Sequence, residues 1–500
     1  MIAFIKSVFS RDVRKRAVKE TRAAEPQVRA GWDAAQTTTN NQNHWANADS
    51  LSPAAAVSKS VRSALRTRSR YEVANNCYAR GIINTIANDT IGTGPHLQMQ
   101  TDSDAFNTVV EVLFNEWARE IGLREKLLTG RKARSESGEV FFVFITNVKL
   151  KSPVKLDIRV VESDQCTADD YNGLTEEDNA DGIKYDAAGN PVSYRILRSH
   201  PGSETVVGSQ EVTPTPASQV VHMYREERPG QPRGVPEISA ALPLFAIMRR
   251  YTLAVVEAAE TAANNSFVIS TEHASLDADS IDFDVSPFEV VDMERNMATV
   301  MPAGWRATQM KAEQPTDTYP DFKKEIINEV ARCMSVPFNI AAGNSSSYNY
   351  ASGRLDHQSY FNDIGIEQAY QNDTILYTTF MKFMAELLMT GELDGVEKPT
   401  DIMPDKYHES KEWFWDGHEQ MDPLRESKAQ EVRLKNNVTN LAIECSKEGY
   451  DWKEVMDQRI KERRKAEDGG LEDPLALKNL EADKYGGDPD AYLLNETEGL

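Results

Sequence analysis

The chain has 500 residues, of which 40% are hydrophobic and 27% are charged, and its formal net charge is -22 at pH 7. This acidity weighs against a sequence-reading nucleic-acid binder, which needs a surplus of Lys and Arg for phosphate contacts, but it does not exclude a protein that conducts DNA. The length provides for several domains with a large core, and no run of eighteen apolar residues is present to span a bilayer.

The cysteines indicate the compartment in which the chain is made. Cys77, Cys166, Cys333 and Cys445 lie far apart and form no CxxC pair. This spacing argues against a zinc site or a disulfide framework and for a reducing compartment. The apolar start at residues 2–5 precedes its basic run, which is the wrong order for a secretory signal. We therefore expect synthesis in the cytoplasm.

Helices are expected first along the chain. Residues 1–59 change from a basic start to a Thr- and Asn-rich stretch and then an alanine-rich one, which is typical of a flexible arm. Apolar positions recur from Ser60 to Ala87 and predict a helix that ends before the Gly92–Pro95 turn. A second helix is predicted from Phe106 to Trp117.

Strands follow these helices. Residues 139–145 form a buried apolar run, and residues 154–160 alternate strictly between apolar and polar. A turn at Asp186–Pro191 separates two short strand patterns and predicts a hairpin, and residues 219–224 predict a further strand. The first half of the chain is therefore expected to be α+β.

A proline- and glycine-rich segment precedes the next long helix. It reads Arg-Pro-Gly-Gln-Pro-Arg-Gly-Val-Pro over residues 228–236, and a mostly apolar helix is expected directly after it, over residues 237–263. Tyr319–Ser335 then repeats apolar residues every four positions, which predicts an amphipathic helix.

The two helices of the second half are separated by an uncharged polar loop. Residues 339–352 carry Asn, Ser, Tyr, Ala and Gly and no charged side chain, so we expect a mobile loop with little anchorage. From Gly353 to Leu388 no proline interrupts the chain, and about 36 helical residues would extend roughly 54 Å. A helical hairpin with a surface loop is the plainer interpretation of this stretch alone.

At residues 228–236 the chain resembles the lambda-type family of phage portal proteins. In that family the same segment follows a strand ending near a histidine, as His222 does here. Similar features recur in the same order elsewhere, and the resemblance spans roughly residues 30–471. They are Arg68, Arg70, Asn75, Asn76 and Gly92–Gly94 upstream, and residues 413–415, 422–426 and 448–455 downstream.

The resemblance implies a portal-protein fold of the α+β class. It assigns a flexible N-terminal arm to residues 1–59, a peripheral α+β wing to 60–236, a first stem helix to 237–263, a small β-containing clip to 264–316, a second stem helix to 317–335, a tunnel loop to 336–353, a long spine helix to 354–390, a helical crown to 391–465 and an acidic flexible tail to 466–500.

The resemblance also implies a function. Portal proteins form a dodecameric ring at one capsid vertex, through which double-stranded DNA is packaged and ejected without sequence specificity. The implied partners are other copies of the chain, the terminase packaging motor, major capsid and scaffold proteins, and head completion or neck proteins. The implied location is the virion, with the host cytoplasm during assembly, and neither a membrane nor a cofactor is expected.

The tunnel loop is the predicted DNA-facing site. In a ring, one lysine per loop would neutralise many phosphates and pin the duplex, whereas neutral hydrogen-bonding groups exchange partners with water. Arg354 just past the loop is placed either to modulate grip on DNA or to pair with Asp356 or Asp363 of a neighbouring copy. The predicted residues are Asn339, Asn344, Ser345, Ser346, Ser347, Tyr348, Asn349, Tyr350 and Arg354, and the predicted family motif is Arg228, Pro229, Gly230, Gln231, Arg233, Gly234, Val235 and Pro236.

Enzymatic signals are weak. The chain has no GxxxxGK[ST] loop and no Gly-x-Ser-x-Gly motif. His418–Asp422 resembles HExxH but has Asp in place of the second His, and the alternating acids of Asp277–Asp284 fit a solvated loop better than a cation site. We therefore expect no catalytic, metal or cofactor residues. The alternatives are a tail or baseplate adaptor ring and a metal-dependent hydrolase.

Overall fold

A computed structural model describes residues 42–168, 179–203, 212, 214–264, 268–271, 305–308, 318–346, 348–400, 402–417 and 423–470. The chain divides into two compact units, Met1–Ser52 and Pro53–Leu500. All helices and strands named below belong to the second unit, which mixes helices with four small sheets. The α+β expectation is confirmed at this level.

The unit opens with helices α3 (Pro53–Ala56), α4 (Lys59–Asn75) and α5 (Cys77–Ile91). The sequence predicted one helix over residues 60–87, and this is wrong at Asn76, which has extended backbone (φ -119°). The Asn76 side chain accepts a hydrogen bond from the Tyr78 backbone N–H at 3.0 Å and caps α5. A capping Asn inside an otherwise helical pattern thus marks a break between two helices.

The central sheet has β2 (Glu139–Thr146) between β3 (Leu156–Glu162) and β8 (Val220–Tyr224), all antiparallel. Alternate residues of β2 pack into two different cores. Phe142 and Phe144 belong to one core, and Phe141 and Val143 belong to the core on the opposite face. Because both faces of β2 are covered, its sequence is continuously apolar, as a strand buried on both sides requires. The predicted strands at 139–145 and 219–224 are confirmed.

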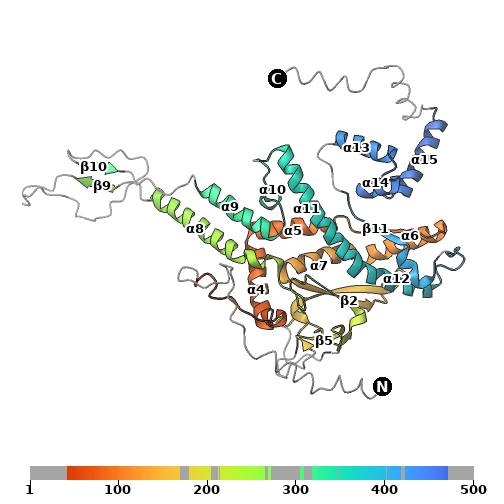
Figure 1. Cartoon of the computed structure of the whole chain (residues 1–500), viewed down its shortest axis with the longest axis horizontal. Helices are drawn as coiled ribbons and strands as arrows, with labels where there is room; N and C mark the ends of the chain where they lie inside the picture. The colour runs from red at the N-terminus through yellow and green to blue at the C-terminus, as the bar shows by residue number, and fades with distance from the viewer. Residues whose placement is uncertain are drawn as a thin grey trace, which may run out of the picture. The chain divides into compact units, whose positions relative to one another are not determined.

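Helices cover one face of this sheet and a second small sheet covers the other (Figure 1). The helices are α6 (Asp104–Ile121), α7 (Leu123–Ser137) and α12 (Tyr377–Thr390). The small sheet has the order β4 (Asn179–Ala180), β5 (Ile183–Tyr185), β6 (Pro191–Tyr194) and β7 (Thr215–Pro216), which confirms the predicted hairpin. Short 3-10 turns η2 (Ser163–Gln165) and η3 (Ala217–Gln219) connect the two sheets.

Helix α7 had no prediction because its buried side is mostly not apolar. It buries Arg131, Arg134 and Gly130 as well as leucines. A Cβ on Gly130 would lie 2.3 Å from the Phe142 ring, so the glycine allows α7 to approach the sheet closely. Helical periodicity of hydrophobic residues cannot detect such a helix.

A separate core, the α8–α9 core, joins helices that lie far apart in the chain. It contains residues of α5, of η4 (Glu237–Ala241) and α8 (Leu242–Asn264), of α9 (Thr318–Cys333), and of α10 (Phe338–Ala342) and α11 (Tyr350–Gln371). The predicted helices at 237–263 and 319–335 are therefore present, the first with a 3-10 start. Beyond them β9 (Val268–Thr271) pairs with β10 (Trp305–Thr308). Most of the predicted β-containing clip, residues 264–316, lies outside the described residues.

The predicted long helix is confirmed. Helix α11 continues through a π-helical segment η5 (Asn372–Leu376) into α12, and Figure 1 shows the three as one rod. Tyr360 and Ile364 of α11 pack in the α8–α9 core, whereas Phe380 and Phe383 of α12 pack against the central sheet. One helix thus connects the two main cores.

The C-terminal part is less helical than expected. After η6 (Pro404–Glu409), β11 (Lys411–Phe414) pairs antiparallel with β1 (His96–Met99). The prediction of a helical region over 391–465 is wrong at these residues, because a strand more than 300 positions earlier supplies the ladder partners. Helices α13 (Pro423–Lys435), α14 (Leu441–Lys447) and α15 (Trp452–Asp468) follow.

Candidate functional site

The predicted loop is shorter and better ordered than the sequence suggested. Helix α10 occupies its first part, with Ala341 buried and Phe338 and Ile340 packed against the α8–α9 core. Gly343, at φ 63°, ends α10 in the left-handed conformation that glycine adopts readily. Among the described residues of the loop, 343–346 and 349 are exposed. The expectation of an unanchored stretch from 339 is wrong because Ile340 and Ala341 provide an apolar anchor.

Asn339, which was predicted to face DNA, is buried. Its side chain is 6% exposed, and its Nδ2 lies 3.0 Å from Nε2 of His357 on α11. Buried polar groups are normally held by such hydrogen bonds. The predicted DNA-facing role of Asn339 is therefore corrected to a structural link between α10 and α11.

The side chains of two further loop asparagines accept hydrogen bonds from backbone N–H groups a few residues later in the chain. Asn344 Oδ1 accepts from the Ser346 N–H at 2.9 Å, and Asn349 Oδ1 accepts from the Ser352 N–H at 2.9 Å as the N-cap of α11. Both residues are nevertheless exposed, as is Ser345. Their amide and hydroxyl groups thus remain at the surface while the backbone of the loop is shaped locally.

The remaining predicted residues lie at the end of the loop. Tyr348 is half-buried and its side chain is hydrogen-bonded to Asp356 of α11, and burial and this carboxylate raise its pKa. Tyr350 is already the first residue of α11, and Arg354 is exposed in its second turn. Ser347 lies outside the described residues.

The family motif is built around a buried ion pair rather than a surface site. Arg233 is 1% exposed, and its Nε lies 3.0 and 2.9 Å from the two carboxylate oxygens of Glu139, which is fully buried at the start of β2. Glu139 also accepts a hydrogen bond from the Gly234 N–H at 3.0 Å, and a second hydrogen bond of 2.9 Å joins it to His222 Nε2. This bidentate geometry suits a guanidinium and not an ammonium group.

Charge is balanced within this cluster. Arg62 of α4 contacts both Glu139 and Asp181, and Arg233 Nη1 donates to the Asp181 backbone oxygen at 2.5 Å. Burial alone would raise the pKa of Glu139, but Arg233 and His222 outweigh it and hold that pKa well below its ordinary value. Burial also lowers the pKa of His222, so the imidazole is neutral near pH 7. Two arginines thus face two carboxylates.

Close backbone packing explains the glycines of the motif. A Cβ on Gly234 would lie 2.1 Å from the Gly138 carbonyl oxygen, and a Cβ on Gly138 would lie 2.5 Å from the Val235 carbonyl carbon. Within the same motif Gln231 is buried and donates to the Arg233 backbone oxygen at 2.8 Å. Arg228, Pro229 and Gly230 are exposed. The motif therefore locks the start of β2 to the segment that leads into η4 and α8.

A second ionic cluster connects α7 with η4 and α11. Glu237 accepts from Arg131 Nη1 at 2.9 Å and from Arg134 Nε at 3.1 Å, and Arg134 also pairs with Glu367 of α11. Burial would raise the pKa of Glu237, but Arg131 and Arg134 lower it to about 2. Sequence reasoning missed this cluster because its members lie on three elements far apart in the chain.

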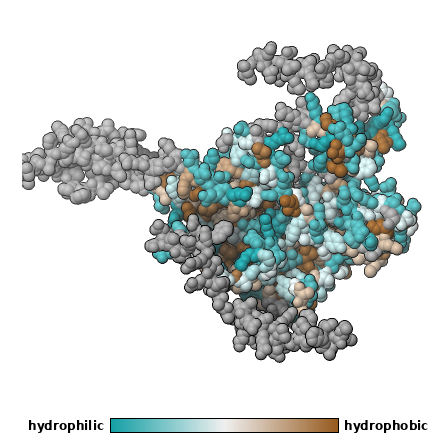
Figure 2. Space-filling model, viewed as in Figure 1, coloured by the Kyte–Doolittle hydropathy of each residue, from teal (hydrophilic) through white to brown (hydrophobic). Residues whose placement is uncertain are grey.

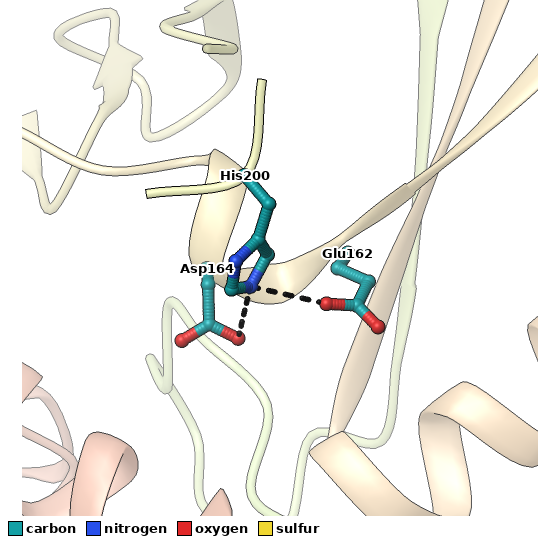
Figure 3. A group of neighbouring side chains, drawn as sticks. All are labelled: Glu162, Asp164 and His200. Atoms are coloured by element: carbon teal, nitrogen blue, oxygen red, sulfur yellow. Dashed lines mark ion pairs between the residues drawn. The ribbon is translucent and has the colours of Figure 1, made fainter. Parts of the chain in front are cut away.

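One group of side chains has the composition of a metal site. Glu162, Asp164 and His200 bring their ligand atoms within 4.8 Å of one another (Figure 3). However, Arg70 Nη2 lies 2.7 Å from Asp164 and 3.6 Å from Glu162, and Arg66 Nη2 lies 3.0 Å from Asp164. Arginine already supplies the positive charge that a cation would bring. The sequence candidates His418–Asp422 and Asp277–Asp284 lie outside the described residues.

The comparison with protein families decides the identification. Residues 39–368, more than half of the chain, match the family described as phage portal protein, lambda family. The chain belongs to this family. Over 471 residues it is also 22% identical to a probable portal protein of Halomonas phage phiHAP-1, covering 88% of this chain and 87% of that protein. The resemblance seen in the sequence is thereby confirmed.

Solved structures of neck assemblies are also similar to this portal-family chain. A chain from the neck of an empty gene transfer agent particle gives a TM-score of 0.42 at 14% identity, covering 77% of this chain and 93% of that one. A chain from the neck of the native particle, of C12 symmetry, gives 0.43 at 15% identity, covering 77% and 91%.

Family membership gives the general role. A phage portal protein is a structural component of the virion at the junction of head and tail, and the family is structural rather than enzymatic. The ionic clusters agree with that role, because their charges are paired internally and serve to fasten helices and sheet together.

Proposed function

We propose that twelve copies of the chain close into a ring at one capsid vertex, and that double-stranded DNA enters and leaves the capsid through the channel of this ring. The proposal rests on membership of the lambda portal family. The observation that supports assembly into a ring is the exposed apolar surface of α8. The observation that supports the channel is the uncharged loop before α11.

Helix α8 presents apolar side chains that the described residues leave exposed. Leu253, Val256 and Ile247 are 57%, 48% and 41% exposed, and Figure 2 shows hydrophobic residues over the region of α8 and α9. By length and composition the helix Glu237–Glu260 is apolar enough to cross a membrane. Only 28% of its most apolar 18-residue window is buried within the protein. Because Leu242, Phe245 and Met248 anchor its first half in a protein core, we propose that neighbouring copies cover the rest.

The exposed loop suits passage of DNA rather than capture. A phosphate-pairing lysine in each of twelve loops would steepen the salt dependence by about 0.9 per neutralised phosphate and hold the duplex fast. The loop instead exposes Asn344, Ser345, Ser346 and Asn349, whose hydrogen bonds are each worth about 1 kcal/mol net. In the proposed ring these groups follow the DNA backbone while they exchange partners with water.

The other parts receive roles by position in the chain. Residues 60–236 form the wing, α8 and α9 the stem, the β9–β10 region the clip, the rod of α11 and α12 the spine, and the helices after β11 the crown. We propose that the clip binds the terminase motor and later the neck proteins, and that the outer surface meets capsid and scaffold proteins. Assembly takes place in the host cytoplasm.

Negative-stain imaging of the purified chain tests this function. A ring of twelvefold symmetry with an axial hole is the expected result. A chain that stays monomeric at high concentration, and also alongside capsid components, would overturn the proposal. A ring that fails to support DNA packaging in a reconstituted reaction would identify a tail or baseplate adaptor, and metal-dependent turnover by a monomer would identify a hydrolase.

A further inference from the structure

Two charged side chains of α11 have no ion-pair partner in the part of the chain that the structure describes. Glu367 pairs with Arg134, and Asp356 lies against Tyr348. In contrast, Arg354 and Asp363 are both exposed, and neither has an ion-pair partner among the residues that the structure describes. The same helix thus carries one unpaired cation and one unpaired anion, which are of opposite charge.

The helix cannot join these two charges to each other. They are nine positions apart, which separates them by roughly 13.5 Å along the axis and by half a turn around it, so they occupy opposite faces of α11. The residues three and four positions from Arg354 contain no acid, and those around Asp363 contain no base. Each charge therefore requires a partner from outside its own helix.

Asp363 lies at a cavity that is suited to receive a cation. The cavity has a volume of about 370 Å³, and its lining includes Asp363, Ile366 and Tyr370 of α11. Three arginines and four carboxylates line it, which leaves one negative charge in excess. Arg131 and Arg134 inside it are already bound to Glu237 and Glu367. Ile366, 70% exposed, offers an apolar wall for the stem of an incoming side chain.

We propose that Arg354 of one copy inserts into this cavity on the next copy and pairs with its Asp363. The inference rests on the proposed ring, in which each copy offers one face to the copy ahead and the opposite face to the copy behind. The two opposite faces of α11 then contact two different neighbouring copies. Arg354 on one copy therefore meets Asp363 on the adjacent copy. The pair fastens the base of each loop to the adjacent copy and neutralises the charge nearest to the loop.

Cysteine cross-linking tests the contact directly. In a background with Cys77, Cys333 and Cys445 changed to Ser, because Cys333 lines the same cavity, the double variant Arg354→Cys with Asp363→Cys is treated with a short bismaleimide that replaces the reach of the Arg side chain, and is separated under denaturing conditions. A ladder of linked copies is expected, and each single variant should give no ladder beyond dimers. Intact rings without a ladder would overturn the pairing while leaving the ring in place. Absence of rings from the unmodified chain would instead overturn the proposed function.

Charge reversal gives a second readout. Arg354→Glu or Asp363→Arg alone should weaken association about two- to fivefold per interface, seen as ring dissociation at lower salt, and the double reversal should restore it. Arg119→Glu, an exposed charge reversal on α6, is the matched control and should leave ring stability unchanged. If Arg354→Glu alters DNA packaging but not the salt stability of rings, Arg354 faces DNA and the proposal fails.

Discussion

At the scale of single residues, the family motif acts through burial. Arg233 meets Glu139 from a position 94 residues later in the chain, and both side chains are almost completely enclosed. A buried ion pair of this kind adds little over an apolar replacement, yet removal of one partner leaves the other charge uncompensated. The motif is therefore better explained by geometry and by the need for charge balance than by contact with DNA.

Replacing Arg233 with Met should destabilise the chain by about 3–5 kcal/mol, because Glu139 would remain buried without its main partner. Urea unfolding measures the change. Arg228→Met is the matched control, since Arg228 belongs to the same motif but is exposed, and its expected effect is below about 1 kcal/mol. Equal effects of the two substitutions would contradict the structural role of Arg233.

At the scale of elements, the loop between α10 and α11 combines a fixed frame with a neutral surface. The packing of α10, the Asn349 cap and the Tyr348 contact with Asp356 hold both ends, while residues 343–346 remain exposed. A loop held in this way can present the same groups to a passing duplex without collapsing onto the core.

Replacing all of residues 344–347 with lysine should slow or stall DNA packaging, because each added cation can neutralise a phosphate and steepen the salt dependence by about 0.9. Packaged DNA per capsid measures the effect, with ring formation checked by imaging. The same four positions changed to glutamine serve as the neutral control and should package nearly normally. Normal packaging by the lysine variant would remove the loop from the mechanism.

At the scale of the whole molecule, the two main cores differ in how completely one chain encloses them. The core of the central sheet is covered by α6, α7 and α12, whereas Ile247, Leu253 and Val256 of α8 stay exposed among the described residues. Such a surface favours assembly of identical copies, because apolar area removed from water contributes about 25 cal/mol per Å².

Replacing Leu253 and Val256 of α8 with glutamine should therefore prevent ring assembly while the single chain keeps its fold. The expected loss is about 1–3 kcal/mol per interface, measured by native mass spectrometry across a concentration series. Val148→Gln, at a site 79% exposed in the connection between β2 and β3, is the control and should assemble normally. Unchanged melting of the monomer together with unchanged rings would show that α8 does not form the interface.

The sequence by itself determined the strands at 139–145 and 219–224, the hairpin, the helices on either side of the loop, the long helix and the family. The strands and helices depend on periodicity or residue order within a short window, and the family resemblance depends on the order of several short motifs along the chain. Only the tertiary structure decided the pairing of β1 with β11, the burial of Asn339, and the partners of Arg233 and Glu237. These features join residues distant in the chain, and local patterns carry no signal for which distant groups will neutralise or cover one another.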